Sequence, residues 1–146
     1  MNSQMELKKF SPDYIDELRS WFDHDNAGNE FIRFYAQPEQ WLRLVDNAQR
    51  FGYAAVVDKK MVGFVDVELN ERHEASFALG ISPEVRGQGF GKQLVALTES
   101  FAKSRHATSL YAGVEEANTA CRQLLKSRGF REVPESDGMV GYSKPL

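Results

Sequence analysis

The chain has 146 residues, of which 42% are hydrophobic and 27% are charged, a composition sufficient for one globular domain over residues 1–146 with its own core. Its longest apolar runs, at residues 53–57 and 61–65, are far shorter than the roughly 18–20 residues of a membrane span, so we expect no membrane partner. Eighteen basic and 21 acidic residues give a formal net charge of −3, which provides no electrostatic footprint for nucleic acid.

The N-terminal third is predicted to form a short strand and two helices. Residues 5–10 read as the strand, and Ser11 followed by Pro12 is typical of a helix start, with serine as cap and proline in the first turn. Residues 23–29 are polar and form a loop, and a second helix begins at Pro38. The residues expected on the buried sides of the two helices are Ile15, Leu18 and Phe22, then Trp41, Leu44, Val45 and Ala48.

Three strands follow, over residues 53–57, 61–69 and 75–82. Short polar turns at residues 58–60 and 70–73 connect them, which predicts an antiparallel meander. In the second strand the carboxylates Asp66 and Glu68 alternate with apolar residues, so both point to the same face of the sheet.

The second half of the chain alternates helices and strands. Apolar residues at helical spacing predict a helix from residue 90 to about residue 104, and residues 110–114 read as a strand. Asn118 caps a further helix that Gly129 closes, and the last strands cover residues 130–133 and 139–143. The order β, α, α, β, β, β, α, β, α, β, β indicates an α/β (α+β) fold, a mixed and mostly antiparallel central sheet flanked by helices.

A glycine-rich turn at residues 86–91 joins the third strand of the meander directly to a helix. Glycines let a ligand approach the backbone, several amide N–H groups point into one concavity, and the helix N-terminus adds partial positive charge. The turn therefore predicts a phosphate site, to which Arg86 and Lys92 can add formal charge.

Spacing decides which phosphate ligand the turn suits. A dinucleotide fingerprint that starts at Gly87 needs a glycine where Lys92 stands, so a Rossmann site is excluded. A Walker A loop needs glycine at Arg86 and serine or threonine at Gln93, so a nucleoside triphosphatase is excluded as well. What remains is the pattern Arg-x-x-Gly-x-Gly, formed by Arg86, Gly89 and Gly91.

This pattern resembles the acyl-coenzyme A motif of the GNAT (GCN5-related) N-acetyltransferases. The preceding meander and the stretch from Asn118 to Gly129 and Phe130 resemble the same family, so the likeness extends over residues 53–133. The resemblance implies acetyl-CoA as co-substrate and an enzyme that acetylates a primary amine on a small molecule, a peptide N-terminus or a lysine. Since residues 1–6 show no basic segment followed by an apolar stretch, we expect a cytoplasmic location. The residues that it implies in cofactor binding are Leu79, Ile81, Arg86, Gly87, Gln88, Gly89, Phe90, Gly91, Lys92 and Asn118.

In the family, the strand before the turn pairs with the pantetheine arm, and one of its amides polarises the thioester carbonyl. Here that strand is residues 77–81, and the amide would be that of Leu79, Gly80 or Ile81; Gly80 also favours a local irregularity. The general base would be a carboxylate on a central strand. The candidates are Glu74, Glu68 and Asp66, with Glu74 favoured by approximate alignment, and the alternative is that all three lie on solvated faces of the meander.

The usual general acid of the family is a tyrosine seven residues after the asparagine, and here Leu125 stands in its place. Tyr111 and Tyr142 are candidate substitutes, with a structural role as the alternative for each. The CoA thiol is acidic enough, with a pKa of about 8.5 by analogy with cysteine, to leave unaided. Cys121 lies on the apolar side of its helix, so we expect it to pack rather than to act as a nucleophile.

The acceptor site of the family is built mainly by the N-terminal helices. Acidic and aromatic residues in that zone could hold an ammonium group by charge and by cation–π contact. These residues are Asp23, His24, Asp25, Glu30, Phe31, Arg33, Phe34, Tyr35 and Trp41. Three separated histidines and one cysteine give no metal-ligand pattern, so no metal is expected.

Two rival functions stay open beside acetyl transfer. A non-catalytic acyl-CoA binding or sensing module would share the fold, and the missing tyrosine supports it. A nucleotide-dependent phosphate-loop enzyme is the other, against which both spacing failures argue. A homodimer is a further open alternative.

Overall fold

The computed structural model describes residues 4–45 and 47–146 and is built around one seven-stranded sheet with the strand order β1-β2-β3-β4-β5-β7-β6. The strands are β1 (Glu6–Lys9), β2 (Arg50–Val57), β3 (Lys60–Leu69), β4 (Glu74–Ile81), β5 (Ser109–Glu115), β6 (Arg131–Val133) and β7 (Met139–Pro145). The helices are α1 (Ile15–Ser20), α2 (Pro38–Leu44), α3 (Phe90–Ser104) and α4 (Thr119–Ser127), joined by 3-10 turns at Pro12–Tyr14, Asn29–Phe31, Arg33–Ala36 and Pro83–Val85. The predicted order of elements and the mixed, mostly antiparallel sheet are confirmed.

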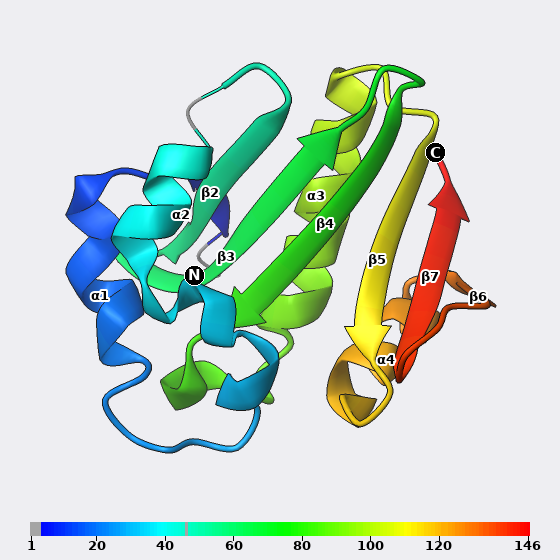
Figure 1. Cartoon of the computed structure of the whole chain (residues 1–146). Coiled ribbons are helices and arrows are strands. Elements are labelled where there is room, and N and C mark those ends of the chain that lie inside the picture. Colours follow the sequence, from blue (N-terminus) through cyan, green and yellow to red (C-terminus); the bar gives the residue numbers. More distant parts are fainter. Residues whose placement is uncertain (1–3, 46) are drawn as a thin grey trace.

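The neighbouring strands β4 and β5 are parallel, and they pair over only a short part of their length. β4 pairs with β5 through three residue pairs, from Glu74 with Ser109 to Ser76 with Tyr111. Beyond Ser76 the two strands diverge, and Figure 1 shows a gap that widens toward the C-terminal end of β4. We call this diverging region the splay. All other neighbouring strands are antiparallel.

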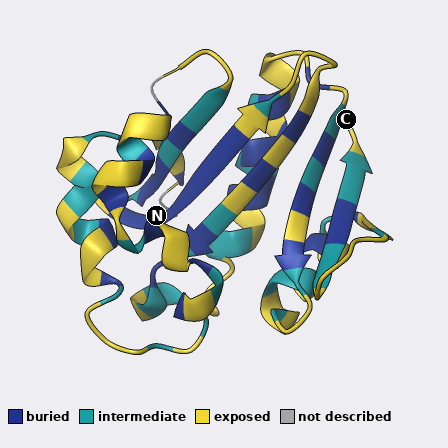
Figure 2. Ribbon diagram, in the orientation of Figure 1, coloured by how far each residue is buried: buried dark blue, intermediate teal, exposed yellow. Residues whose placement is uncertain are grey.

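Helices cover both faces of the sheet and leave part of one face open. α1 and α2 lie over β1 to β3, whereas α3 and α4 lie on the opposite face (Figure 1). Because both layers cover β3, its residues 61–67 are all buried, whereas β4 alternates between buried and exposed residues (Figure 2). Ala75 and Phe77 of β4 enter the core under α3, so Glu74, Ser76 and Ala78 face the open side.

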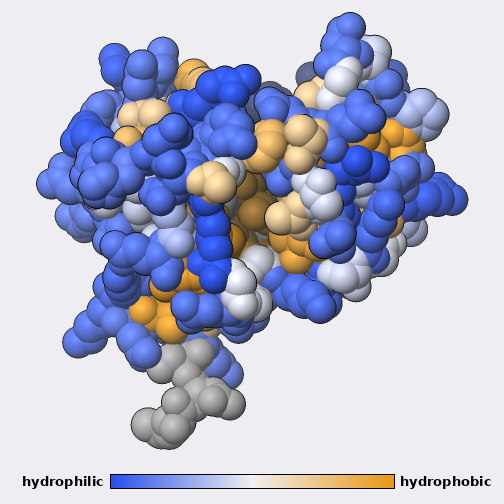
Figure 3. All heavy atoms as spheres, turned by 90° about the horizontal axis from the view of Figure 1, so that it is seen from below, coloured by the Kyte–Doolittle hydropathy of each residue, from blue (hydrophilic) through white to orange (hydrophobic). Residues whose placement is uncertain are grey.

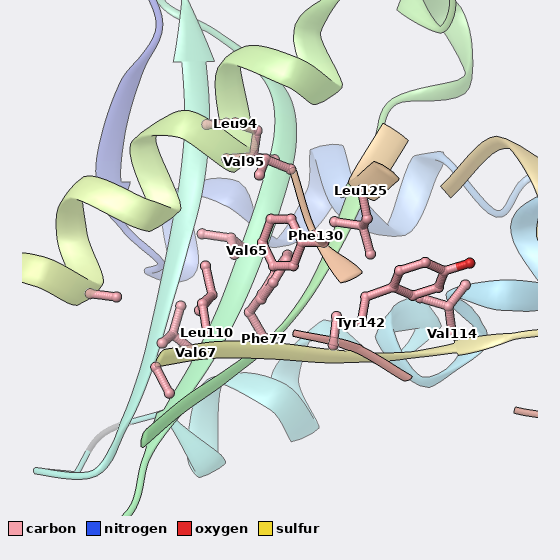
Figure 4. Close-up of a cluster of buried hydrophobic side chains, with 14 of the residues drawn as sticks. Val65, Val67, Phe77, Leu94, Val95, Leu110, Val114, Leu125, Phe130 and Tyr142 are labelled. Atoms are coloured by element: carbon pink, nitrogen blue, oxygen red, sulfur yellow. The ribbon is translucent and has the colours of Figure 1, made fainter. Parts of the chain in front are cut away.

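The two cores differ in character. The α3 side is mainly aliphatic and includes Val65, Val67, Leu94 and Leu110 (Figure 4). The α1 and α2 side is aromatic, with the ring of Trp41 4.3 Å from that of Phe10 and 5.3 Å from that of Phe64 between centroids. In the described part of the chain, no helix is both long and apolar enough to cross a membrane.

Most element boundaries agree with the sequence, and two local expectations are wrong. The predicted helix start at Ser11 and Pro12 is present, with Ser11 as the N-cap; its first turn is 3-10 and it becomes α-helical at Ile15. Leu44 and Ala48 are exposed rather than buried, because α2 ends at Leu44 and the helical period does not continue. Gly80 marks no irregularity in β4, since its pairing with β3 is continuous; a Cβ there would lie 2.3 Å from the Phe64 ring, so close packing requires the glycine.

Candidate functional site

The glycine-rich turn lies at the wide end of the splay. β4 leads through Ser82 and the turn Pro83–Val85 into residues 86–89, and α3 begins at Phe90. Gly87 and Gly89 have φ angles of +79° and +85°, in the left-handed region where glycine is favoured. A Cβ at either position would meet no atom within 4 Å, so the outer surface of the turn is open to a ligand.

Backbone donors converge at this turn. The first N–H groups of an α-helix have no intrahelical acceptor, and in α3 these groups follow directly from the two left-handed glycines. Gln88 and Lys92 are exposed beside them, and Phe90 and Gly91 are half-buried. Together, the free amides, the helix dipole of a 15-residue helix and the Lys92 ammonium group can hold an anionic phosphate.

The guanidinium of Arg86 is bonded to protein oxygens that lie outside residues 87–92. Its Nε donates to the carbonyl oxygen of Ile81 (3.1 Å), and its two terminal nitrogens donate to the carbonyl of Ala27 and to Oδ1 of Asn29 (3.3 Å). Burial lowers the pKa of Arg86 from its usual value. The sequence predicted that the positive charge of Arg86 contacts the phosphate. In the structure this charge is instead bonded to Ala27, Asn29 and the end of β4.

The splay itself offers unpaired backbone on β4. Alternate residues of a strand direct their N–H and C=O groups to opposite neighbours, and from Phe77 onward the neighbour on the β5 side has moved away. Leu79 and Ile81 pack their side chains under α3, while Ala78 and Gly80 leave the other face with little side-chain bulk. Seen from the wide end of the splay, the molecule is hollowed between its two halves, with hydrophobic residues on the floor and a rim of mixed hydropathy (Figure 3).

Asp66 is not solvated, contrary to one of the sequence interpretations. The residue is 5% exposed, and its carboxylate accepts hydrogen bonds from Arg50 Nε (3.0 Å), from a terminal nitrogen of Arg50 (2.7 Å) and from the Tyr35 hydroxyl (2.9 Å). Burial, followed by the charge of Asp66, raises the pKa of Tyr35. Since three donors occupy this carboxylate, its arrangement is that of a structural ion pair.

Glu68 and Glu74 lie on the same open face but at different depths along the splay. The Glu68 side chain is 59% exposed, and one of its carboxylate oxygens lies 3.6 Å from a terminal nitrogen of Arg50. In the β3–β4 pairing, Glu68 lies opposite Ser76. Glu74 is the first residue of β4 and accepts a hydrogen bond from Asn70 (2.8 Å). At about 3.3 Å per residue, Leu79 lies about 10 Å along β4 from Ser76 and about 16 Å from Glu74.

A cavity of about 330 Å³ lies at the closed end of the splay. Its lining combines the two carboxylates with hydroxyl groups. The lining residues are Glu68, Leu69, Asn70, Glu74, Ala75, Ser76, Ser109, Tyr111 and Ser143.

The two tyrosines proposed as acids have protein partners. Tyr142 is fully buried beside Leu125 (Figure 4); its hydroxyl donates to Glu132 (3.0 Å) and accepts from Arg122 Nε (3.0 Å). The Tyr111 hydroxyl donates to Glu135, and burial together with this bond raises the pKa of Tyr111 to about 12. These contacts support the structural alternative for both residues.

Asn118 caps α4 as predicted, because its Oδ1 accepts a hydrogen bond from the Cys121 amide (3.2 Å). It lies half-buried three residues after β5, the strand that forms the far wall of the splay. The predicted left-handed closure of α4 at Gly129 is also present, with φ at +89°.

Cys121 has the surroundings of a packing residue. It contacts the aliphatic core, and burial raises the pKa of its thiol to about 11, so almost no thiolate exists at neutral pH. We expect the substitution Cys121→Ala to keep turnover within about threefold of the parent, because direct transfer of the acetyl group to the amine uses no protein thiol. Ping-pong kinetics, or an acetylated Cys121 in the mass spectrum, would contradict this.

Sequence reasoning missed the partners that organise the site. The register of β2 on β3 places Arg50 opposite Glu68, and its side chain reaches diagonally to Asp66, which lies opposite Gly52. Ala27 and Asn29 meet Arg86 across 59 and 57 positions of the chain. No local pattern signals such contacts. Among the described residues, no group of three or more His, Cys, Asp or Glu side chains is placed to hold a metal ion.

Comparison with known proteins gives a consistent result. The model of the acetyltransferase (GNAT) family matches residues 15–130. The chain is 29% identical to the spermidine N(1)-acetyltransferase of Vibrio cholerae, over 90% of this chain and 82% of that protein. It is 24% identical to an uncharacterized N-acetyltransferase of Methanocaldococcus jannaschii, over 96% of this chain but only 66% of that relative. The N-acetyltransferase PseH of Campylobacter jejuni, solved in complex with acetyl coenzyme A, has the same fold, with a TM-score of 0.77 at 17% identity over 97% of this chain and 98% of PseH.

Proposed function

We propose, because the chain belongs to the acetyltransferase (GNAT) family, that it transfers an acetyl group from acetyl-CoA to a primary amine. One observation carries the proposal, which is the position of the left-handed glycine turn at the wide end of the splay. A phosphate-bearing cofactor held at that turn can extend its arm along the unpaired backbone of β4. The spermidine and PseH acetyltransferases among the similar proteins support the reaction class.

Acetyl-CoA would be held mainly by backbone groups. The amides of Gly87 to Lys92 would bind the pyrophosphate, and the Lys92 ammonium group would add charge. The backbone of Leu79 and Ile81 would pair with the pantetheine arm inside the splay, where one amide can polarise the thioester carbonyl. Asn118, which caps α4 just after the far wall, would border the same arm.

The chemical step needs few protein groups. The neutral amine attacks the carbonyl carbon, a C–N bond forms, the C–S bond breaks, and CoA leaves as a thiolate. The amine loses one proton, for which Glu68 is the best-placed acceptor, through water, because Asp66 is already paired with Arg50 and Glu74 lies farther from Leu79. Since Leu125 stands where the family has its tyrosine, the thiolate would leave without a protein acid.

Ligand-induced stabilisation tests cofactor choice. Acetyl-CoA at a hundredfold excess over its Kd should stabilise the protein by about 2.7 kcal/mol, which is a rise in Tm of roughly 5–10 °C for a chain of this length. ATP and NAD should produce no shift, because the glycine spacing fits neither of their loops. A shift with ATP but none with acetyl-CoA would refute the assignment.

The acceptor class and the non-catalytic alternative are separated by one screen. Release of CoA thiol is measured with a library of small amines, peptides with free N-termini and lysine peptides. The relative from V. cholerae makes polyamines the first class to test. Binding of acetyl-CoA without thiol release from any amine would favour the sensing module.

A further inference from the structure

The Arg86 side chain connects the glycine turn to the segment between α1 and α2. Each of its three guanidinium nitrogens donates to a protein oxygen, one on Ile81 at the end of β4 and two on Ala27 and Asn29. A guanidinium has five N–H donors in a fixed planar fork, so these bonds define its direction as well as its position. All three acceptors lie outside the glycine turn, so the guanidinium is committed to protein oxygens and not to a ligand.

The receiving segment is shaped around this guanidinium. Gly28 has φ at +96°, and a Cβ there would lie 2.9 Å from a terminal nitrogen of Arg86. Asn29 is 8% exposed, and its Nδ2 donates to the carbonyl oxygens of Trp21 (3.0 Å) and His24 (3.2 Å) while its Oδ1 accepts from Arg86. One amide side chain thus joins the end of α1, the following loop and the turn.

The same segment continues across the splay on the open face. A terminal guanidinium nitrogen of Arg33 lies 3.6 Å from a carboxylate oxygen of Glu115 at the end of β5. The Tyr35 hydroxyl donates to Asp66 on β3. Residues 27–36 are therefore attached near the end of β4 through Arg86 and at the end of β5 through Glu115. In Figure 1 they lie in front of the C-terminal half of β4, on the side opposite α3.

We propose that Arg86 is a positioning residue for the acceptor amine and not a ligand of the cofactor phosphates. By fixing residues 27–29 at the exit of β4, it aligns the wall formed by residues 27–36 with the mouth of the splay, where the amine must approach. The inference rests on the proposed acetyl transfer. It assigns the phosphates to the amides of residues 87–92 and to Lys92 instead.

The test compares Arg86→Lys and Arg86→Gln with Asn29→Ala, which removes the contact from the loop side, and with Lys92→Gln as a control. Coenzyme A affinity is measured by calorimetry, and amide hydrogen exchange is measured at residues 29, 31 and 32, whose N–H groups donate within the segment. For the Arg86 and Asn29 variants we expect CoA affinity within about threefold of the parent and exchange faster by about tenfold or more. Lys92→Gln should weaken CoA binding and leave this exchange unchanged.

Turnover adds a third measurement. With the best amine from the screen, the Arg86 variants should raise the amine KM by about tenfold while the acetyl-CoA KM keeps its parental value. Loss of CoA affinity by tenfold or more in both Arg86 variants, or parental exchange at residues 29–32 in them, overturns the proposal. A parent that fails to bind acetyl-CoA defeats the acetyltransferase assignment instead, and the exchange measurement still decides whether Arg86 orders the segment.

Discussion

The substitution Gly89→Val is expected to weaken acetyl-CoA binding by at least about a hundredfold, a loss of roughly 2.7 kcal/mol, while the protein stays folded. Gly89 is the N-cap of α3 with φ at +85°, and a Cβ there meets no protein atom within 4 Å. The Cβ of a branched side chain would therefore have room at this position. It would occupy the surface through which phosphate oxygens must approach the amides. Calorimetry with acetyl-CoA measures the effect.

Gly129 provides a matched control for the backbone strain. Its φ is +89°, close to that of Gly89, and a Cβ there would have only ordinary contacts with the Lys144 side chain at 3.7 Å and 3.8 Å. A non-glycine residue in this conformation costs about 1–2 kcal/mol, so Gly89→Val and Gly129→Val should lower Tm by similar amounts. Only Gly89→Val should lose affinity. Equal affinities in the two variants would show that the turn is structural.

The substitution Glu68→Gln is expected to lower turnover at pH 7 by about a hundredfold, the lower end of general-base contributions. An alkylamine with a pKa near 10.4 is almost wholly protonated at this pH, so removal of its proton depends on an acceptor near the thioester. Part of the lost rate should return at high pH, where free amine accumulates. The affinity for acetyl-CoA should change little, because the Glu68 side chain lies on the open face of the sheet.

Glu74→Gln is the comparison for this prediction. Glu74 shares the open face but lies about 16 Å along β4 from Leu79, so its variant should keep turnover within about threefold of the parent. The pH dependence of kcat is measured for both variants. Loss of turnover in Glu74→Gln with a parental pH profile in Glu68→Gln would assign the role of proton acceptor to Glu74. A parental pH dependence of kcat in both variants would indicate that solvent accepts the proton of the amine.

The sequence was sufficient for the order of elements and for the turn, because both depend on local patterns. Apolar periodicity identified α3 and the meander, and glycine spacing excluded the Rossmann and Walker A loops. Asp66 was different: its alternation with apolar neighbours indicated an exposed face, but α2 and the residues before it cover that part of the sheet. The burial of Asp66 and its pairing with Arg50 depend on long-range packing and on strand register.

Long-range geometry also decided the candidate base and the role of Arg86. Approximate alignment favoured Glu74 over Glu68 as the base, and this preference changes only when the end of β4 that separates from β5 is known. Arg86 belongs to the glycine pattern, so its charge was naturally assigned to the phosphate. The acceptors that engage it come from a loop whose composition is merely polar.

The position of β7 between β5 and β6 has a consequence for how the chain folds. β2, β3 and β4 can pair in sequence through short turns, so this half of the sheet can form early from local contacts. Among the strands that the structure describes, β6 pairs with β7 alone, and β5 gains a full-length neighbour only when β7 inserts beside it. The two halves should therefore form at different rates, with insertion of β7 as the slow step. Until that step is complete, the β5 wall of the cofactor site lacks a rigid support.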